Sequence, residues 1–138
     1  MNNKIIPLFL FTLLLGLTFI SSCDDTLNQN PIDNIIIPSQ DVSYNKYIQP
    51  IFNYKCNNSG CHNSQDFAGG IDLTTWNGAV SDPSVVFPFQ PENSRLVWAI
   101  EGISGANPMP PIGAPVTPLT RNQIEGIRTW IKEGADNN

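Results

Sequence analysis

The chain has 138 residues, and its 7 Lys and Arg against 12 Asp and Glu give a formal net charge of −5 at pH 7. This length suffices for one small domain with leader segments. The acidic balance argues against a nucleic-acid partner and against binding to anionic lipid by charge. Twelve prolines and ten glycines predict much loop around a few short helices.

Residues 1–22 have the composition of a lipoprotein signal peptide. Lys4 supplies a positive charge, and the apolar run over residues 5–20 is shorter than the roughly 20 residues of a membrane-spanning helix. The run ends in Ile20-Ser21-Ser22-Cys23, which resembles the bacterial lipobox. We therefore expect cleavage before Cys23, acylation of its thiol, and a lipid anchor in a bacterial membrane that faces the periplasm or the cell surface. The alternatives are an uncleaved anchor or a cysteine without a role.

Residues 23–40 are mostly polar and contain Pro31 and Pro38, which predicts a lipid-anchored tether. Within it, the β-branched run 35–37 is a candidate for a short extended strap on the domain surface. The folded domain is expected over residues 41–138, with no repeat and no second domain.

The domain is predicted to be mainly α, with about four short helices and long loops rich in proline and glycine. The first helix follows a cap at Asp41 or Ser43, is kinked or restarted at Pro50, and ends near Lys55. The second helix is expected to begin at a cap on Thr74 or Thr75 and to end at Val80. The third is expected to begin at a cap on Asn93 or Ser94 and to stop at Gly102.

The last helix carries the clearest signals. Thr120 and Gln123 have the spacing of a capping box, and Gly134 is placed to end the helix. Ile124, Ile127 and Ile131 form an apolar stripe that Trp130 borders.

Two of the three cysteines and the only histidine lie in Cys56-Asn57-Asn58-Ser59-Gly60-Cys61-His62. A Cys…Cys-His ending is typical of c-type haem attachment, usually with two residues between the cysteines. The two thiols add to the vinyl groups of the haem, and the adjacent imidazole takes one axial position on the iron. Here four residues separate the cysteines, and they are small and turn-forming, so a larger loop between the thioethers is sterically acceptable.

The second axial position calls for methionine or histidine, which are the usual ligands of electron-transfer haem. His62 is the only histidine, and Met1 leaves with the signal peptide, so Met109 is the conventional ligand that remains. It lies in Asn107-Pro108-Met109-Pro110-Pro111, where the flanking proline rings restrict the backbone.

Three alternatives stay open for these residues. A closed zinc site needs four ligands, and Cys56, Cys61 and His62 supply three, so a carboxylate such as Asp66 would have to complete it. A Cys56–Cys61 disulfide in an oxidising compartment would make the protein a haem-free binding or adhesion lipoprotein. A haem with an open iron position would make it a haem enzyme or a gas sensor.

No side chain stands out as an acid, base or nucleophile, so we predict no catalytic residue and no enzyme.

Six segments in order resemble the planctomycete-type cytochrome c domain, which is also found in Bacteroidetes-type lipoproteins. These segments are residues 47–52, 56–62, 69–73, 91–96, 109–111 and 119–135. The resemblance spans about residues 42–136 and departs from the commonest cytochrome pattern in the four-residue spacer.

This resemblance implies a class I-like cytochrome c fold with one covalent haem c per chain. It makes Cys56 and Cys61 the thioether cysteines, His62 the proximal iron ligand and Met109 the distal one. The implied function is electron transfer to redox protein partners outside the cytoplasm, and the acidic surface favours a basic docking patch on such a partner. The side chains predicted to pack on the haem or in the core are Ile51, Phe52, Trp76, Leu96, Ile100, Ile127 and Trp130.

Overall fold

The computed structural model describes residues 31–103 and 105–138. The predicted signal peptide, Cys23 and the first part of the tether lie outside the described residues. Within them the chain forms four α-helices and no strand, which confirms the predicted small, mainly α domain. The helical elements are η1 (Pro31–Asn34), η2 (Tyr44–Ile48), α2 (Gln49–Lys55), η3 (Ala68–Gly70), α3 (Trp76–Val80), η4 (Pro91–Asn93), α4 (Arg95–Glu101) and α5 (Arg121–Lys132).

The first helical segment changes its geometry close to the proline that the sequence singled out. It begins as a turn of π-helix, η2, in which the Ser43 hydroxyl accepts a hydrogen bond from the Lys46 N–H at 3.2 Å. Pro50 lies in the first turn of α2, where its missing N–H leaves no helical bond unmade. The predicted restart at the proline is confirmed, and the segment carries the chain to Cys56.

The last helix begins as its capping box predicts. The Thr120 hydroxyl accepts from the Gln123 N–H at 3.2 Å, and the Gln123 side-chain oxygen accepts from the Thr120 N–H at 2.9 Å. Gly134, with φ of 117°, follows the end of α5. Trp130 is buried within the apolar face of this helix rather than at its border.

The two middle helices differ in how they begin. Thr75 caps α3 by accepting from the Gly78 N–H at 3.1 Å, as one of the two predicted caps. Ser94 precedes α4, but its hydroxyl accepts from the Phe87 N–H at 2.9 Å and donates to the Gln90 carbonyl at 3.0 Å. Ser94 is therefore the N-cap residue of α4, as one of the two predicted caps, but its side chain makes no capping bond because backbone groups of the preceding loop use the hydroxyl instead.

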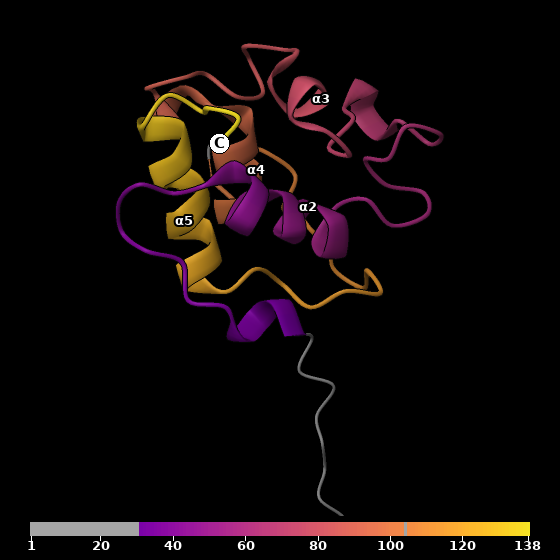
Figure 1. The fold of residues 1–138 in the computed structure, drawn as a ribbon. Coiled ribbons are helices and arrows are strands. Elements are labelled where there is room, and N and C mark those ends of the chain that lie inside the picture. Colours follow the sequence, from indigo (N-terminus) through magenta and orange to yellow (C-terminus); the bar gives the residue numbers. More distant parts are fainter. Residues whose placement is uncertain (1–30, 104) are drawn as a thin grey trace, which may run out of the picture.

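An aromatic cluster joins the first and last helical segments. The ring centroid of Trp130 lies 5.2 Å from that of Tyr44 and 6.4 Å from that of Phe52. All three side chains are almost fully buried. Figure 1 shows α2 crossing beside α5, so this cluster forms the core on which the rest of the domain is assembled.

Residues 31–42, here called the strap, pack along α5 (Figure 1). Ile37 is buried, and the Asn122 side chain bonds to its N–H and its carbonyl at 2.8 and 3.1 Å. The Glu133 carboxylate accepts from the N–H groups of Asp41 and Val42 at 2.7 and 2.9 Å. The part of the predicted tether from residue 31 onward is thus held on the domain, by side chains more than eighty residues away in the sequence.

No helix among residues 31–103 and 105–138 is both long and apolar enough to cross a membrane.

The strap depends on close contact at Gly126. A Cβ atom added there would lie 2.7 Å from Cγ2 and 2.8 Å from Cδ1 of Ile37. We predict that Gly126→Ala lowers the free energy of unfolding by about 1–3 kcal/mol through overpacking, although alanine favours a helix interior over glycine by about 1 kcal/mol. Urea unfolding followed by circular dichroism measures the change.

The matched control is Gly126→Ala combined with Ile37→Ala, which makes room for the added methyl group. The double variant should lose less stability than the sum of the two single variants. A Gly126→Ala protein as stable as the wild type would contradict this account of the strap.

Candidate functional site

The segment from Cys56 to His62 forms a loop closed by its own backbone. The N–H groups of Cys56 and Asn57 both donate to the Phe52 carbonyl at 2.9 Å, which ends α2. The His62 N–H then donates to the Cys56 carbonyl at 3.0 Å. This bond brings His62 back beside Cys56. The four residues between the two cysteines therefore bulge out.

Asp66 stabilises the bulge from outside. Its carboxylate accepts from the Gly60 N–H at 2.7 Å and from the Asn63 side chain at 2.8 Å. Gly60 has φ of 79°, a left-handed conformation that glycine adopts at low cost. The hydrogen bonds from Asn63 and Gly60 hold the pKa of Asp66 below its usual value of 3.8. The side chain named as an example of a fourth zinc ligand is thus hydrogen-bonded within the loop.

His62 is held at both its backbone and its ring. Its carbonyl accepts from the Leu73 N–H at 2.9 Å, and ring Nδ1 lies 3.0 Å from the Ala68 carbonyl. A carbonyl only accepts, so Nδ1 must carry the proton in this contact. In a neutral imidazole this leaves the lone pair on Nε2, which is the form in which histidine binds a metal.

The two cysteines are free thiols in half-buried positions. Burial, together with the neighbouring Cys61 thiol, raises the pKa of Cys56 to about 12. Cys56 is therefore a protonated, uncharged group at neutral pH in the described conformation.

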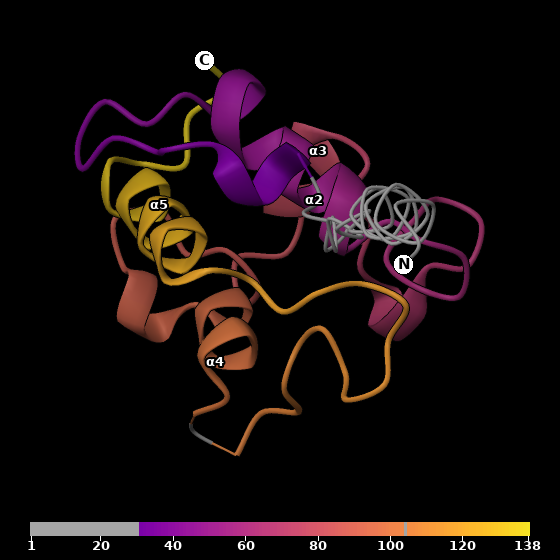
Figure 2. The same cartoon turned by 90° about the horizontal axis from the view of Figure 1, so that it is seen from below.

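Met109 follows a loop that leaves α4, and its N–H donates to the Ala99 carbonyl at 2.9 Å. The peptide bond between Met109 and Pro110 is cis. In Figure 2 the chain from α4 reaches toward the side of the 56–75 loops before it returns to α5. The methionine is thus carried on a segment that is fixed to α4 at its own backbone.

The structure brings all four predicted site residues to one cavity of about 600 Å³. Cys56, Cys61 and His62 line it from the closed loop, and Met109 lines it from the loop after α4. Its volume lies within the range of ligand pockets, about 300–1,000 Å³. Much of the remaining wall is apolar and comes from Ile71, Leu73, Val85, Leu96, Trp98, Ala99, Ile100, Pro110, Pro111, Val116 and Leu119.

The predicted apolar side chains all belong to one buried core or pack against it, and two of them also line this cavity. Leu96 and Ile100 line the cavity. Ile51, Phe52, Ile127 and Trp130 lie in the same buried core without lining the cavity, and Trp76 packs against that core. Trp98, Ile71 and Leu119 were not predicted as site residues. Ile71 and Leu119 lie in segments that carry the cytochrome resemblance, which is a signal that could have found them.

The Asp66–Gly60 contact gives a prediction for pH. A carboxylate whose pKa is lowered in the folded state stabilises that state fully above its unfolded pKa, and this contribution is lost as the pH falls through the folded value. The backbone amide resonance of Gly60 should therefore titrate with a midpoint below 3.8, the usual aspartate value. Two-dimensional nuclear magnetic resonance measures this midpoint.

In Asp66→Ala the same resonance should no longer titrate, while the amide resonances of α5 should keep their positions. A Gly60 midpoint at or above the usual aspartate value would show that the carboxylate does not hold the bulge.

The sequence around the site is similar to a known protein family. A family model described as planctomycete cytochrome C matches residues 59–113. The matched span contains Cys61, His62 and Met109, and it begins three residues after Cys56. No significant match was found among curated proteins or solved structures.

The donor set fits the haem c that this family implies, since two thiols, an imidazole with a free nitrogen and a thioether meet in a cavity with apolar walls. The match confirms, over residues 59–113, the resemblance to the planctomycete-type cytochrome c domain that was seen in the sequence.

Proposed function

We propose that the protein is a membrane-tethered monohaem c-type cytochrome that transfers electrons outside the cytoplasm. In this proposal His62 and Met109 are the axial ligands of the haem iron, and Cys56 and Cys61 carry the thioether bonds. The observation that supports it best is the single cavity that these four residues share, although Met109 lies far from the others in the sequence. A chance arrangement would have no reason to bring the only histidine and the only methionine after Met1 to one cavity.

The haem would supply a reversible one-electron iron couple. The protein's residues hold it and exclude water. Two thiols and an imidazole line the cavity together, because all three lie on the closed loop. The Ala68 carbonyl fixes the imidazole ring. One cavity of this size supports one haem per chain. None of these residues acts as an acid, base or nucleophile, so the proposal is for an electron carrier and not an enzyme.

The axial pair and the cavity walls both favour a raised reduction potential. Methionine and histidine ligation raises the potential of a haem. An apolar wall such as that of Leu96, Ile100 and Trp98 disfavours the extra positive charge of the oxidised iron.

The proposed anchor is a lipid on Cys23, after export and removal of residues 1–22. The described fold begins at Pro31, so the chain between the lipid and the domain can span at most roughly 25–30 Å. The domain would thus stay close to the membrane surface and meet its partners there.

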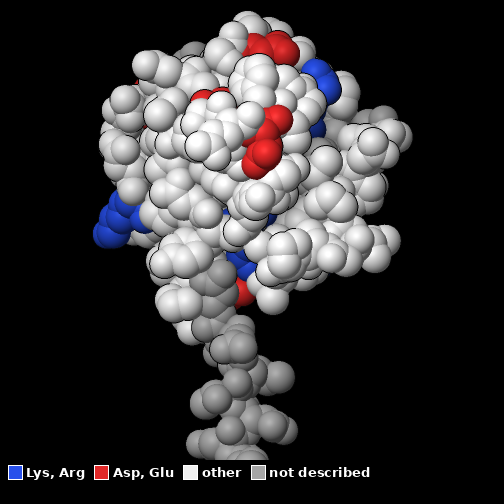
Figure 3. Space-filling model, turned by 90° about the vertical axis from the view of Figure 1, so that its right-hand side faces the viewer, with Lys and Arg blue, Asp and Glu red and all other residues white. Residues whose placement is uncertain are grey.

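The partner is proposed to be another redox protein, and the net charge of −5 favours a basic docking patch on it. Figure 3 views the molecule from the side of the 56–75 loops, and charged side chains are sparse on that face. Association with a basic patch through the net charge should weaken as the ionic strength rises.

The first prediction of this proposal is optical. Protein exported from a bacterium with cytochrome c maturation should show a Soret band and a mass higher than the apoprotein by one haem. Met109→Ala should keep the added mass but bind carbon monoxide in the reduced state, because the distal position is then open. Wild-type protein without a Soret band would refute haem binding.

The second prediction concerns the anchor. Cys23→Ser should move the protein from the membrane fraction to the soluble fraction while its Soret band is unchanged, because lipidation and haem attachment use different cysteines. Retention of Cys23→Ser in the membrane fraction would show that something other than this thiol holds the protein there.

A further inference from the structure

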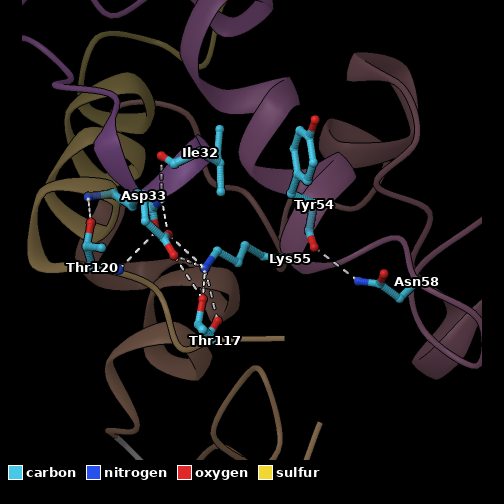
Figure 4. A network of polar contacts seen from close by, with 8 residues as sticks. Ile32, Asp33, Tyr54, Lys55, Asn58, Thr117 and Thr120 are labelled. Atoms are coloured by element: carbon cyan, nitrogen blue, oxygen red, sulfur yellow. Dashed lines mark hydrogen bonds and ion pairs between the residues drawn. The ribbon is translucent and has the colours of Figure 1, made fainter. Parts of the chain in front are cut away.

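A lysine ammonium group is buried next to the proposed haem attachment site. Lys55 directly precedes Cys56, lines the cavity, and is only 2% exposed. Lysine is almost never fully buried unless it is paired. Here the ammonium lies 2.8 Å from Asp33 Oδ1 and 3.2 Å from the Thr117 carbonyl, and it also bonds to the Thr117 hydroxyl (Figure 4).

These contacts join three separate parts of the chain. Asp33 belongs to the strap, Lys55 to α2, and Thr117 to the loop that carries Met109. The Thr117 hydroxyl also donates to Asp33 at 3.0 Å, and the Gln123 side chain of α5 donates to Asp33 at 3.1 Å. All three hydrogens of the ammonium therefore have acceptors, and the acceptors support one another.

Thr117 has a particular place in this arrangement. Among the described residues, the hydrogen bonds that connect residues 110–118 to other parts of the chain all run through Thr117. The segment from Met109 to Thr117 is therefore fixed by hydrogen bonds at its two ends, at Ala99 by the Met109 N–H and at Lys55 by Thr117.

The Lys55 ammonium is buried, whereas the Asp33 side chain is partly exposed. Such a pair is a poor source of stability, because the cost of taking the ammonium out of water offsets much of the attraction. Its better-attested use is to specify one arrangement of the chain among several. What the Lys55 contacts specify here is the position of the methionine loop relative to the helix that ends at Cys56.

We propose that Lys55 is a positioning residue for Met109: through Thr117 it holds the methionine loop against the cavity and so strengthens the bond between the methionine sulfur and the haem iron. This inference rests on the proposed Met109 ligation. Asp33 is the counter-charge of the buried ammonium. The strap therefore also helps to position the methionine loop.

The test uses the mature haem protein and two variants. Lys55→Met removes the ammonium but keeps a long side chain, and Thr117→Val removes only the hydroxyl at an exposed position. Lys132→Met, in the last turn of α5 and exposed, is the matched control for the loss of a lysine. The readouts are the weak far-red absorption band of the sulfur–iron(III) bond and titration with imidazole, which competes with Met109 for the iron.

Both variants should keep their covalent haem, and each should bind imidazole about tenfold more tightly or more, because a weaker methionine bond is easier to displace. Lys132→Met should stay within about twofold of the wild type. Lys55→Met also changes the charge near the haem, whereas Thr117→Val does not, so an effect of Thr117→Val reports position rather than charge. The double variant should show less than the sum of the two single effects.

The inference is overturned if both variants retain the far-red band and wild-type imidazole affinity. If Lys55→Met does not fold, Thr117→Val alone decides between these results. Wild-type protein that lacks the far-red band would instead refute Met109 ligation, and with it the inference. If wild type and both variants all show the far-red band with equal imidazole affinity, the inference about Lys55 fails while Met109 ligation stands.

Discussion

The structure of the site depends on the hydrogen bond from the His62 N–H to the Cys56 carbonyl, 3.0 Å long. It closes a loop in which two thiols and one imidazole are presented together, despite a spacer of four residues. The longer spacer is accommodated outward, where Gly60 takes a left-handed conformation and Asp66 binds its N–H at 2.7 Å. The spacer residues therefore lie on the outside of the loop, while the His62 N–H stays bonded to the Cys56 carbonyl.

A helical core that borders the cavity supports this loop. Tyr44, Phe52 and Trp130 join η2, α2 and α5, and α2 delivers Cys56 directly from that core. The strap is held against α5 by Asn122 and Glu133 and contributes Asp33 to the buried Lys55. Lys55 also bonds to Thr117 of the methionine loop. This one side chain therefore contacts the strap and the methionine loop from the helix that leads to Cys56.

Several helix ends and the Cys-His stretch could be predicted from the sequence because their signals are local. The capping box of Thr120 and Gln123, the proline at 50 and the Cys-His ending each depend on residues a few positions apart. The strap and the Lys55 network depend on contacts across twenty to ninety residues, which no local pattern encodes. The apolar positions of Ile127 and Trp130 predicted burial correctly, but periodicity does not tell whether a buried side chain faces a cofactor cavity or another helix.

The central claim is that one haem iron is held between His62 and Met109. X-ray absorption at the iron edge of the purified mature protein tests it most directly, because it identifies the atoms bound to the metal. The account predicts a single sulfur neighbour beside the nitrogens of the porphyrin and His62, and loss of that sulfur in Met109→Ala. An iron spectrum without a sulfur neighbour, or one unchanged by Met109→Ala, would contradict it.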